Sequence, residues 1–97
     1  MATFISLLRW TPKGIENVRD GPGRLDAARS AFRAVGADIK SFHLVMGRYD
    51  AVVISEGPND ESVAKAMLSI CSHGNVQTET YRAFSEDEFR KIVSALP

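Results

Sequence analysis

Residues 39–55 read Ile-Lys-Ser-Phe-His-Leu-Val-Met-Gly-Arg-Tyr-Asp-Ala-Val-Val-Ile-Ser, and this stretch decides the fold. Its two ends, 39–46 and 50–55, are short runs rich in apolar and β-branched residues, which predicts two strands. Gly47, Arg48 and Tyr49 separate them, so we expect a tight hairpin with a positive φ at Gly47. The centre of the protein is therefore predicted to be an antiparallel sheet.

The residues before this hairpin predict one more strand and two helical pieces. Residues 3–10 form an apolar and aromatic run that stops at Thr11-Pro12, where Thr11 is a suitable helix N-cap. Gly21-Pro22-Gly23 is expected to limit this first helix to about two turns. A main helix over residues 24–35 follows, and Gly36 is its expected C-terminal stop.

The residues after the hairpin predict a helix, a strand and a last helix. Asn59 is a suitable N-cap for a helix that ends near Ser72, and residues 76–84 form the fourth strand. Ser85 and Glu88 have the spacing of a capping box before the last helix. Two helix faces are expected to be apolar. They are Ala64, Met67, Leu68 and Cys71 in the second main helix, and Phe89, Ile92, Val93 and Leu96 in the last.

The order β-α-β-β-α-β-α predicts an α+β, ferredoxin-like split βαβ sandwich with an extra C-terminal helix, in a single domain over residues 1–97. Right-handed crossovers place both main helices on one face of the sheet. Yet the strands are apolar on both faces, and soluble monomers rarely expose a large apolar sheet. We therefore expect a homodimer or higher homo-oligomer that packs sheet to sheet.

The charges of the chain are balanced overall but divided between its halves. Twelve Lys and Arg offset twelve Asp and Glu, which argues against a nucleic-acid partner. Eight basic and four acidic residues give +4 over residues 1–48, and the reverse counts give −4 over 49–97. Two such chains can complement each other, which favours self-association, and the alternative is that each half simply carries a solvated helix of one charge sign.

Targeting features are few. No apolar run approaches the roughly 20 residues that span a membrane. The first residues resemble no signal peptide. The single cysteine, Cys71, fits a reducing compartment, and a cytoplasmic location is expected.

The segments around Gly47-Arg48-Tyr49-Asp50 resemble the GYD-domain family of small, mostly bacterial proteins. The resemblance continues in residues 4–11, 24–28, 46–53, 74–80 and 82–84, and so covers nearly the whole chain. It implies a ferredoxin-like fold of the dimeric α/β-barrel group and no established reaction.

A more distant likeness joins Gly47–Asp50 and residues 75–80 to the effector-binding domains of leucine-responsive and asparagine-type bacterial regulators. Those domains dimerise and bind small molecules, which implies that this chain does the same. It has no helix-turn-helix, so regulation of transcription by this chain alone is not expected. Other domains of this fold include cofactor-free monooxygenases and haem-handling enzymes.

Six residues are candidates for ligand binding: Trp10, His43, Tyr49, Asp50, Glu79 and Tyr81. Trp10 is suited either to a pocket wall or to an interface. If the face shared by Glu79 and Tyr81 looks inward, Glu79 is a buried carboxylate with a raised pKa, and otherwise it is an ordinary surface charge. His43, Tyr49 and Asp50 are the candidates for proton transfer.

No spacing of His or Cys residues predicts a metal site, and no cofactor is expected. The leading hypothesis is a homo-oligomer that binds a small, partly apolar molecule between the sheet and its covering subunit. A cofactor-independent oxygenase or isomerase using His43, Tyr49 and Asp50 is the alternative. A purely structural oligomer is the third possibility, and whether the protein is an enzyme stays open.

Overall fold

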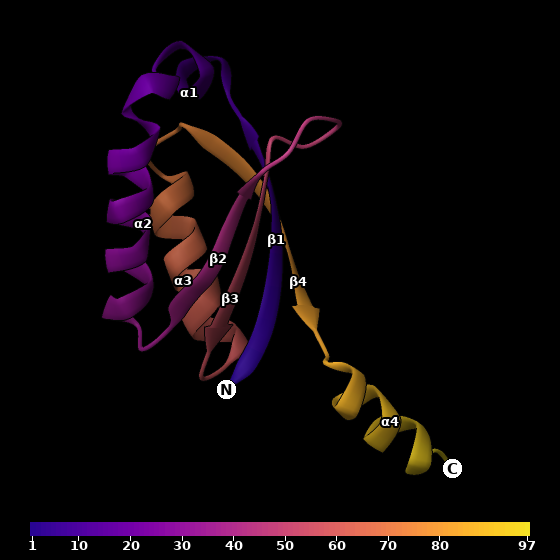
Figure 1. Cartoon of the computed structure of the whole chain (residues 1–97). Helices are drawn as coiled ribbons and strands as arrows, with labels where there is room; N and C mark the ends of the chain where they lie inside the picture. Colours follow the sequence, from indigo (N-terminus) through magenta and orange to yellow (C-terminus); the bar gives the residue numbers. More distant parts are fainter.

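The computed structural model describes all residues, Met1–Pro97, and its centre is one four-stranded antiparallel sheet (Figure 1). The strands are β1 (Ala2–Trp10), β2 (Asp38–Leu44), β3 (Ala51–Gly57) and β4 (Val76–Ala83), in the spatial order β2-β3-β1-β4. This is the order of a split βαβ unit, so the predicted α+β, ferredoxin-like class is confirmed.

The helices divide into a group beside the sheet and one helix apart from it. The short α1 (Pro12–Glu16) and the 3₁₀ turn η1 (Val18–Asp20) lead into α2 (Gly21–Ala34), which packs against α3 (Asp60–Cys71) on one face of the sheet. The last helix, α4 (Glu86–Ser94), extends away from the end of β4 (Figure 1). The predicted one-sided arrangement of the two main helices is therefore confirmed.

Side-chain caps begin three of the helices where the sequence predicts them. Thr11 accepts a hydrogen bond from the Gly14 N–H, and Asn59 accepts one from the Ser62 N–H. Ser85 and Glu88 form a complete capping box, in which each side chain accepts from the other residue's N–H. Each cap satisfies N–H groups that the first helical turn leaves without a partner.

The start of α2 differs from the prediction. Gly21-Pro22-Gly23 forms the first turn of the helix rather than a break before Arg24, and Gly21 has helical angles, with φ −54° and ψ −45°. The helix tolerates Pro22 because the N–H groups of a first turn have no partner inside the helix.

The connection between β2 and β3 also differs from the predicted tight hairpin. The strands end at Leu44 and resume at Ala51, so six residues, 45–50, form the loop. Positive φ angles occur at Gly36 (76°) and Gly74 (80°), where they end α2 and α3, and not at Gly47. In this longer loop Gly47 does not need the left-handed conformation of a two-residue turn.

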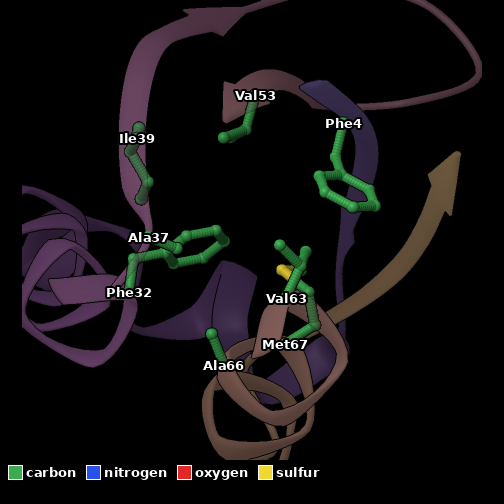
Figure 2. Packing of buried hydrophobic residues seen from close by; sticks show 8 residues of the cluster. All are labelled: Phe4, Phe32, Ala37, Ile39, Val53, Val63, Ala66 and Met67. Carbon is green, nitrogen blue, oxygen red and sulfur yellow. The ribbon is translucent and has the colours of Figure 1, made fainter. Parts of the chain in front are cut away.

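The core fills the space between the sheet and the two main helices. Phe4, Ile39 and Val53 from the strands meet Phe32 from α2 and Met67 from α3 (Figure 2). The predicted face of α3 is wrong at two positions, because Val63 and Ala66 are buried whereas Ala64 and Leu68 are exposed. The actual core face is rotated by about one residue, and 72% of Leu68 is left in solvent.

Candidate functional site

The sheet has one face that no element of the chain covers. Side chains alternate along a strand, and Phe4 and Ser6 of β1 are buried beneath the helices, so Ile5 and Leu7 face the other way. The register places further residues on this open face, which consists of Thr3, Ile5, Leu7, Arg9, Asp38, Ser41, His43, Val52, Ile54, Glu56, Gln77, Glu79, Tyr81 and Ala83. Three of the six candidate ligand-binding residues, His43, Glu79 and Tyr81, belong to this face.

A polar cluster centred on Glu79 stands on the open face. The Tyr49 hydroxyl donates to Glu79 Oε1 at 2.9 Å, and the Tyr81 hydroxyl donates to Glu79 Oε2 at 2.5 Å. The Arg9 guanidinium lies 4.6 Å from the centre of the Tyr49 ring, at cation–π distance. A small hollow of about 200 Å³ lies beside the cluster, and it is lined by Leu7, Arg9, Tyr49, Gln77, Thr78 and Glu79. The structure therefore brings three sequence-predicted residues together as one carboxylate held by two phenols.

The hydrogen bonds of the cluster shift its pKa values in opposite directions. The hydrogen bond from Tyr81, and to a smaller extent the one from Tyr49, holds the pKa of Glu79 below its ordinary value of 4.5. The same bonds raise the pKa of both tyrosines above 10.0, because a phenolate would lose its acceptor and face a carboxylate. Glu79 is exposed and ionised, so the raised pKa expected for an inward-facing Glu79 does not occur.

Asp50 and Tyr49 have separate roles in the β2–β3 loop. The Trp10 N–H donates to Asp50 Oδ2 at 3.0 Å, and the Asp50 N–H donates to the Leu8 carbonyl at 2.8 Å. The Arg9 Nε donates to the Arg48 carbonyl at 2.8 Å. The loop is thereby fastened to the end of β1, and through Tyr49 to β4.

The structure does not bring the three proton-transfer candidates to a common point. His43 is exposed on the edge strand β2, opposite Val52. The Tyr49 hydroxyl is bonded to Glu79, and Asp50 is bonded to the backbone of β1. No group of three or more His, Cys, Asp or Glu side chains is placed to hold a metal ion. None of the helices is long and apolar enough to cross a bilayer.

A much larger cavity, of about 610 Å³, lies on the other side of the sheet, between α2, α3 and the strands. Trp10 and Asp50 line it, so the six predicted site residues are divided between the two faces. The sequence reasoning missed Lys13, Arg24 and Ala28 as further lining residues. The available signal was the run of small residues in α2, Ala27, Ala28 and Ala31, at positions that a close-packed helix fills with larger side chains.

The helix α4 leaves its predicted apolar stripe in solvent. Phe89 is 60% exposed, and Ile92, Val93 and Leu96 are exposed as well. Outside its own turns, α4 is held by an ion pair of 3.7 Å between Arg82 Nη2 and Glu88 Oε2. The stripe has no partner within the chain, although its capping and periodicity are those of a stable amphipathic helix.

These features define a small ferredoxin-like α+β domain with a polar cluster on an uncovered sheet face. Within that class, the sequence pattern of the GYD domain matches residues 4–93. The chain therefore belongs to the GYD domain family, as its resemblance around residues 47–50 predicts.

Similar proteins support this assignment. A Thermus thermophilus protein named "Glutamine synthetase and cystathionine beta-lyase binding protein" is 34% identical over 84 residues, which cover 86% of this chain and 88% of that protein. Two crystal structures show the same fold. TTHA0845, also from Thermus thermophilus, has a TM-score of 0.56 and 24% identity over 88% of this chain and 95% of its own. FFRP-DM1 has a TM-score of 0.59 and 18% identity over 87% of this chain and 100% of its own.

Proposed function

We propose that the chain is a protein-binding module that works as a homodimer, in which two copies pack their open faces together. One observation carries this proposal: the open face has an apolar centre of Ile5, Leu7, Val52 and Ile54, and neither this centre nor the stripe of α4 has a partner within the chain. Burying apolar surface contributes about 25 cal/mol per Å², so two such surfaces favour association. A second copy of the chain can provide a partner for the open face and for the stripe of α4 at once.

The area that the chain exposes to solvent supports an interface of the size found in stable dimers. The chain exposes 6504 Å², whereas a compact monomer of 10.6 kDa exposes about 5,500 Å². The excess of about 1,000 Å² is close to the roughly 800 Å² that each partner contributes to a standard stable interface. The radius of gyration, 14.6 Å, likewise exceeds the roughly 12.5 Å of a compact domain of this length.

The charges on the open face also suit a copy of the same chain. Arg9 and Lys40 provide positive charge there or at its edge, and Glu56 and Glu79 provide negative charge. A two-fold axis brings each residue of one copy near different residues of the other, so bases meet acids. Lys40 and Glu56 already form an ion pair of 3.4 Å within the chain, so Arg9 and Glu79 are the charges that the second copy can match.

The proposed dimer leaves its outer surfaces free for other proteins. Both main helices then point away from the two-fold axis, and Leu68 of α3 is an exposed apolar residue among them. The loop between β2 and β3 presents Met46, whose exposed fraction is 98%. The Thermus relative is named for binding two enzymes of amino-acid metabolism, and we propose an enzyme partner of this kind, in the cytoplasm, for this chain as well.

A small, partly apolar molecule between the open face and the covering subunit is a second candidate, because the hollow beside Glu79 opens on that face. At about 200 Å³ the hollow is smaller than the 300–1,000 Å³ of typical small-molecule sites, so the second copy would have to complete it. The alternative, proton transfer by His43, Tyr49 and Asp50, needs these groups at one substrate, whereas they lie apart.

Light scattering during gel filtration tests the dimer. The full chain is expected to elute with about twice its mass of 10.6 kDa. The variant Ile92→Asp places a charge in the stripe of α4 and is expected to shift the protein toward the monomer. Its control is Ser94→Asp, which adds the same charge to the opposite side of the helix. A wild-type protein that stays monomeric at millimolar concentration would contradict the proposal.

Sedimentation velocity tests the partner. The chain is mixed separately with purified glutamine synthetase and cystathionine β-lyase from its own source organism. It is expected to co-sediment with at least one of them, and Leu68→Asp is expected to weaken that complex without changing the dimer. If neither enzyme binds, the protein-binding part of the proposal is wrong, whereas the dimer is judged by its own measurement.

A further inference from the structure

The cavity between α2, α3 and the sheet is a cleft that opens to solvent. Exposed residues such as Lys13, Leu44 and His73 line its mouth, and buried ones such as Phe32 and Val53 line its inner end. A space of about 610 Å³ would hold roughly 20 water molecules at about 30 Å³ each. Of the 24 residues that line it, 16 are hydrophobic, so such water would find few hydrogen-bond partners. The cavity is therefore suited to an apolar occupant.

The sequence of α2 creates this space. Gly21, Ala28 and Ala31 line the cavity along the helix and reach only a short way toward the sheet. Phe32, at the far end, is 1% exposed and closes the cavity against the core. The facing strand contributes Ala51, which is also small. Small side chains on both sides leave the space between the helix and the sheet unfilled at one end of the domain.

The inner walls are apolar and partly aromatic. Leu8 and Trp10 come from β1, Phe42 from β2, Val53 from β3, and Ile70 from α3. Pockets that bury most of a small ligand are lined in this way, with a few polar groups to orient it. The volume lies within the usual range of about 300–1,000 Å³ for such sites.

The polar groups of the cavity have an excess of positive charge. Lys13 and Arg24 line it, and neither takes part in any ion pair of the chain. Lys13 Nζ donates to the His73 carbonyl at 2.8 Å, and Arg24 Nη2 donates to the Asn17 carbonyl at 2.8 Å. These bonds orient the cations without neutralising them. Asp50 is the one acidic residue in the lining, so the pair of cations leaves one positive charge unmatched.

We infer that this cavity binds a free monocarboxylic acid with a long apolar body, one molecule per chain. The apolar body lies among the walls of the cavity, and the carboxylate lies toward Lys13 and Arg24. A single negative charge matches the unmatched positive one, and a carboxylate accepts charge-assisted hydrogen bonds from both cations. The site lies within one chain and on the side of the sheet opposite the open face, so it does not depend on the dimer proposed above.

Isothermal titration with dodecanoate, below its micelle concentration, tests the binding. Saturable binding of one dodecanoate per chain is expected. Ala28→Phe fills the cavity and is expected to weaken this binding at least tenfold. Ala34→Phe makes the same change at an exposed position of α2 outside the cavity, and it is expected to bind dodecanoate as the wild type does. Equal binding by the two variants would overturn the inference.

Two further measurements guard against a folding defect. Thermal unfolding followed by circular dichroism shows whether Ala28→Phe is folded, and Ala31→Leu is a milder filling variant if it is not. Amide NMR shifts on addition of dodecanoate are expected at residues around the cavity, such as Ala31, Phe42 and Ile70. Shifts confined to the open face or to α4 would place binding elsewhere and contradict the site.

The charged end of the ligand is tested by changing the probe and the cations. Dodecanol and dodecylammonium keep the apolar body but lose the negative charge, so both are expected to bind at least tenfold more weakly than dodecanoate. Replacing both cations, by Lys13→Gln with Arg24→Gln, is expected to remove this preference, whereas Arg33→Gln on the exposed side of α2 leaves it intact. Equal binding of all three probes by the wild type would contradict a carboxylate site.

Discussion

The two faces of the sheet are built from the same strands but have different surroundings. In β3, Val53 is buried under the helices, whereas its neighbours Val52 and Ile54 are only half-buried on the open face. In β1, Phe4 and Ile5 differ in the same way. A strand that is apolar on both faces therefore serves two processes: one face drives the folding of the chain, and the other is available for association. The two faces should respond differently to substitution.

The largest effect is expected on the helix-covered face. Phe32→Ala removes a side chain that is 1% exposed, and it is expected to lower the free energy of unfolding by about 3–5 kcal/mol. This loss of stability should be the same at every protein concentration, because the void left by the missing ring lies within one chain. Urea unfolding followed by circular dichroism measures it. Leu68→Ala, on the exposed side of α3, is the control and should change the value by less than about 0.5 kcal/mol.

On the open face, we expect a substitution to act on the dimer rather than on the fold. Ile5→Thr keeps a β-branched side chain but places a hydroxyl in the proposed interface. It is expected to raise the dissociation constant of the dimer at least about tenfold, or 1.4 kcal/mol, as measured by sedimentation equilibrium. The control Ile15→Thr lies in α1 and should leave the constant unchanged. A loss of stability that is independent of protein concentration would show that Ile5 belongs to the folding core.

Two buried serines sharpen the comparison on the covered face. The Ser6 and Thr80 hydroxyls lie 2.9 Å apart, within hydrogen-bond distance, whereas the Ser55 hydroxyl has no partner. Removing a bonded hydroxyl costs about 1 kcal/mol, while removing an unpartnered buried one is neutral or stabilising. Ser6→Ala is therefore expected to lower the free energy of unfolding, and Ser55→Ala to keep or raise it. The opposite order in urea unfolding would contradict this account.

The smallest effect is the pH dependence of the polar cluster. The pKa of Glu79 is lower in the folded protein, so its stabilisation is present above the ordinary value of 4.5 and is lost as the pH falls through the folded pKa. The pKa of Tyr49 is raised, so its stabilisation is present below 10.0 and is lost as the pH rises through the folded value. Carbon-13 NMR of the Glu79 carboxyl measures the first shift. A raised pKa there would contradict the two phenol hydrogen bonds.

The local features of this fold can be predicted from the sequence because short stretches determine them. The caps at Thr11, Asn59 and Ser85 depend on one side chain and the next helical turn. The buried face of α3 cannot be predicted in this way. Two apolar patterns fit its sequence equally well, one through Ala64 and Leu68 and the other through Val63 and Ala66. Packing against α2 and the sheet decides between the two patterns, and that information is not local.

The candidate site shows the same limit. The period of a strand predicts that Glu79 and Tyr81 share a face. Tyr49 comes to Glu79 from 30 residues away, and only the fold reveals that contact. Trp10 lies on the covered side because it has the parity of Phe4 and Ser6 in β1. The six-residue loop, longer than the predicted hairpin, brings Asp50 to the Trp10 N–H and Tyr49 to Glu79.

The open face is the central feature of this account, and intermolecular NMR contacts test it most directly. Carbon-13-labelled and unlabelled chains are mixed, and the spectrum is filtered for contacts between the two. The account predicts contacts from the methyl groups of Ile5, Leu7, Val52 and Ile54 to the unlabelled chain, together with contacts from Ile92 of α4. Intermolecular contacts confined to α2 and α3, or a monomer with none, would contradict it.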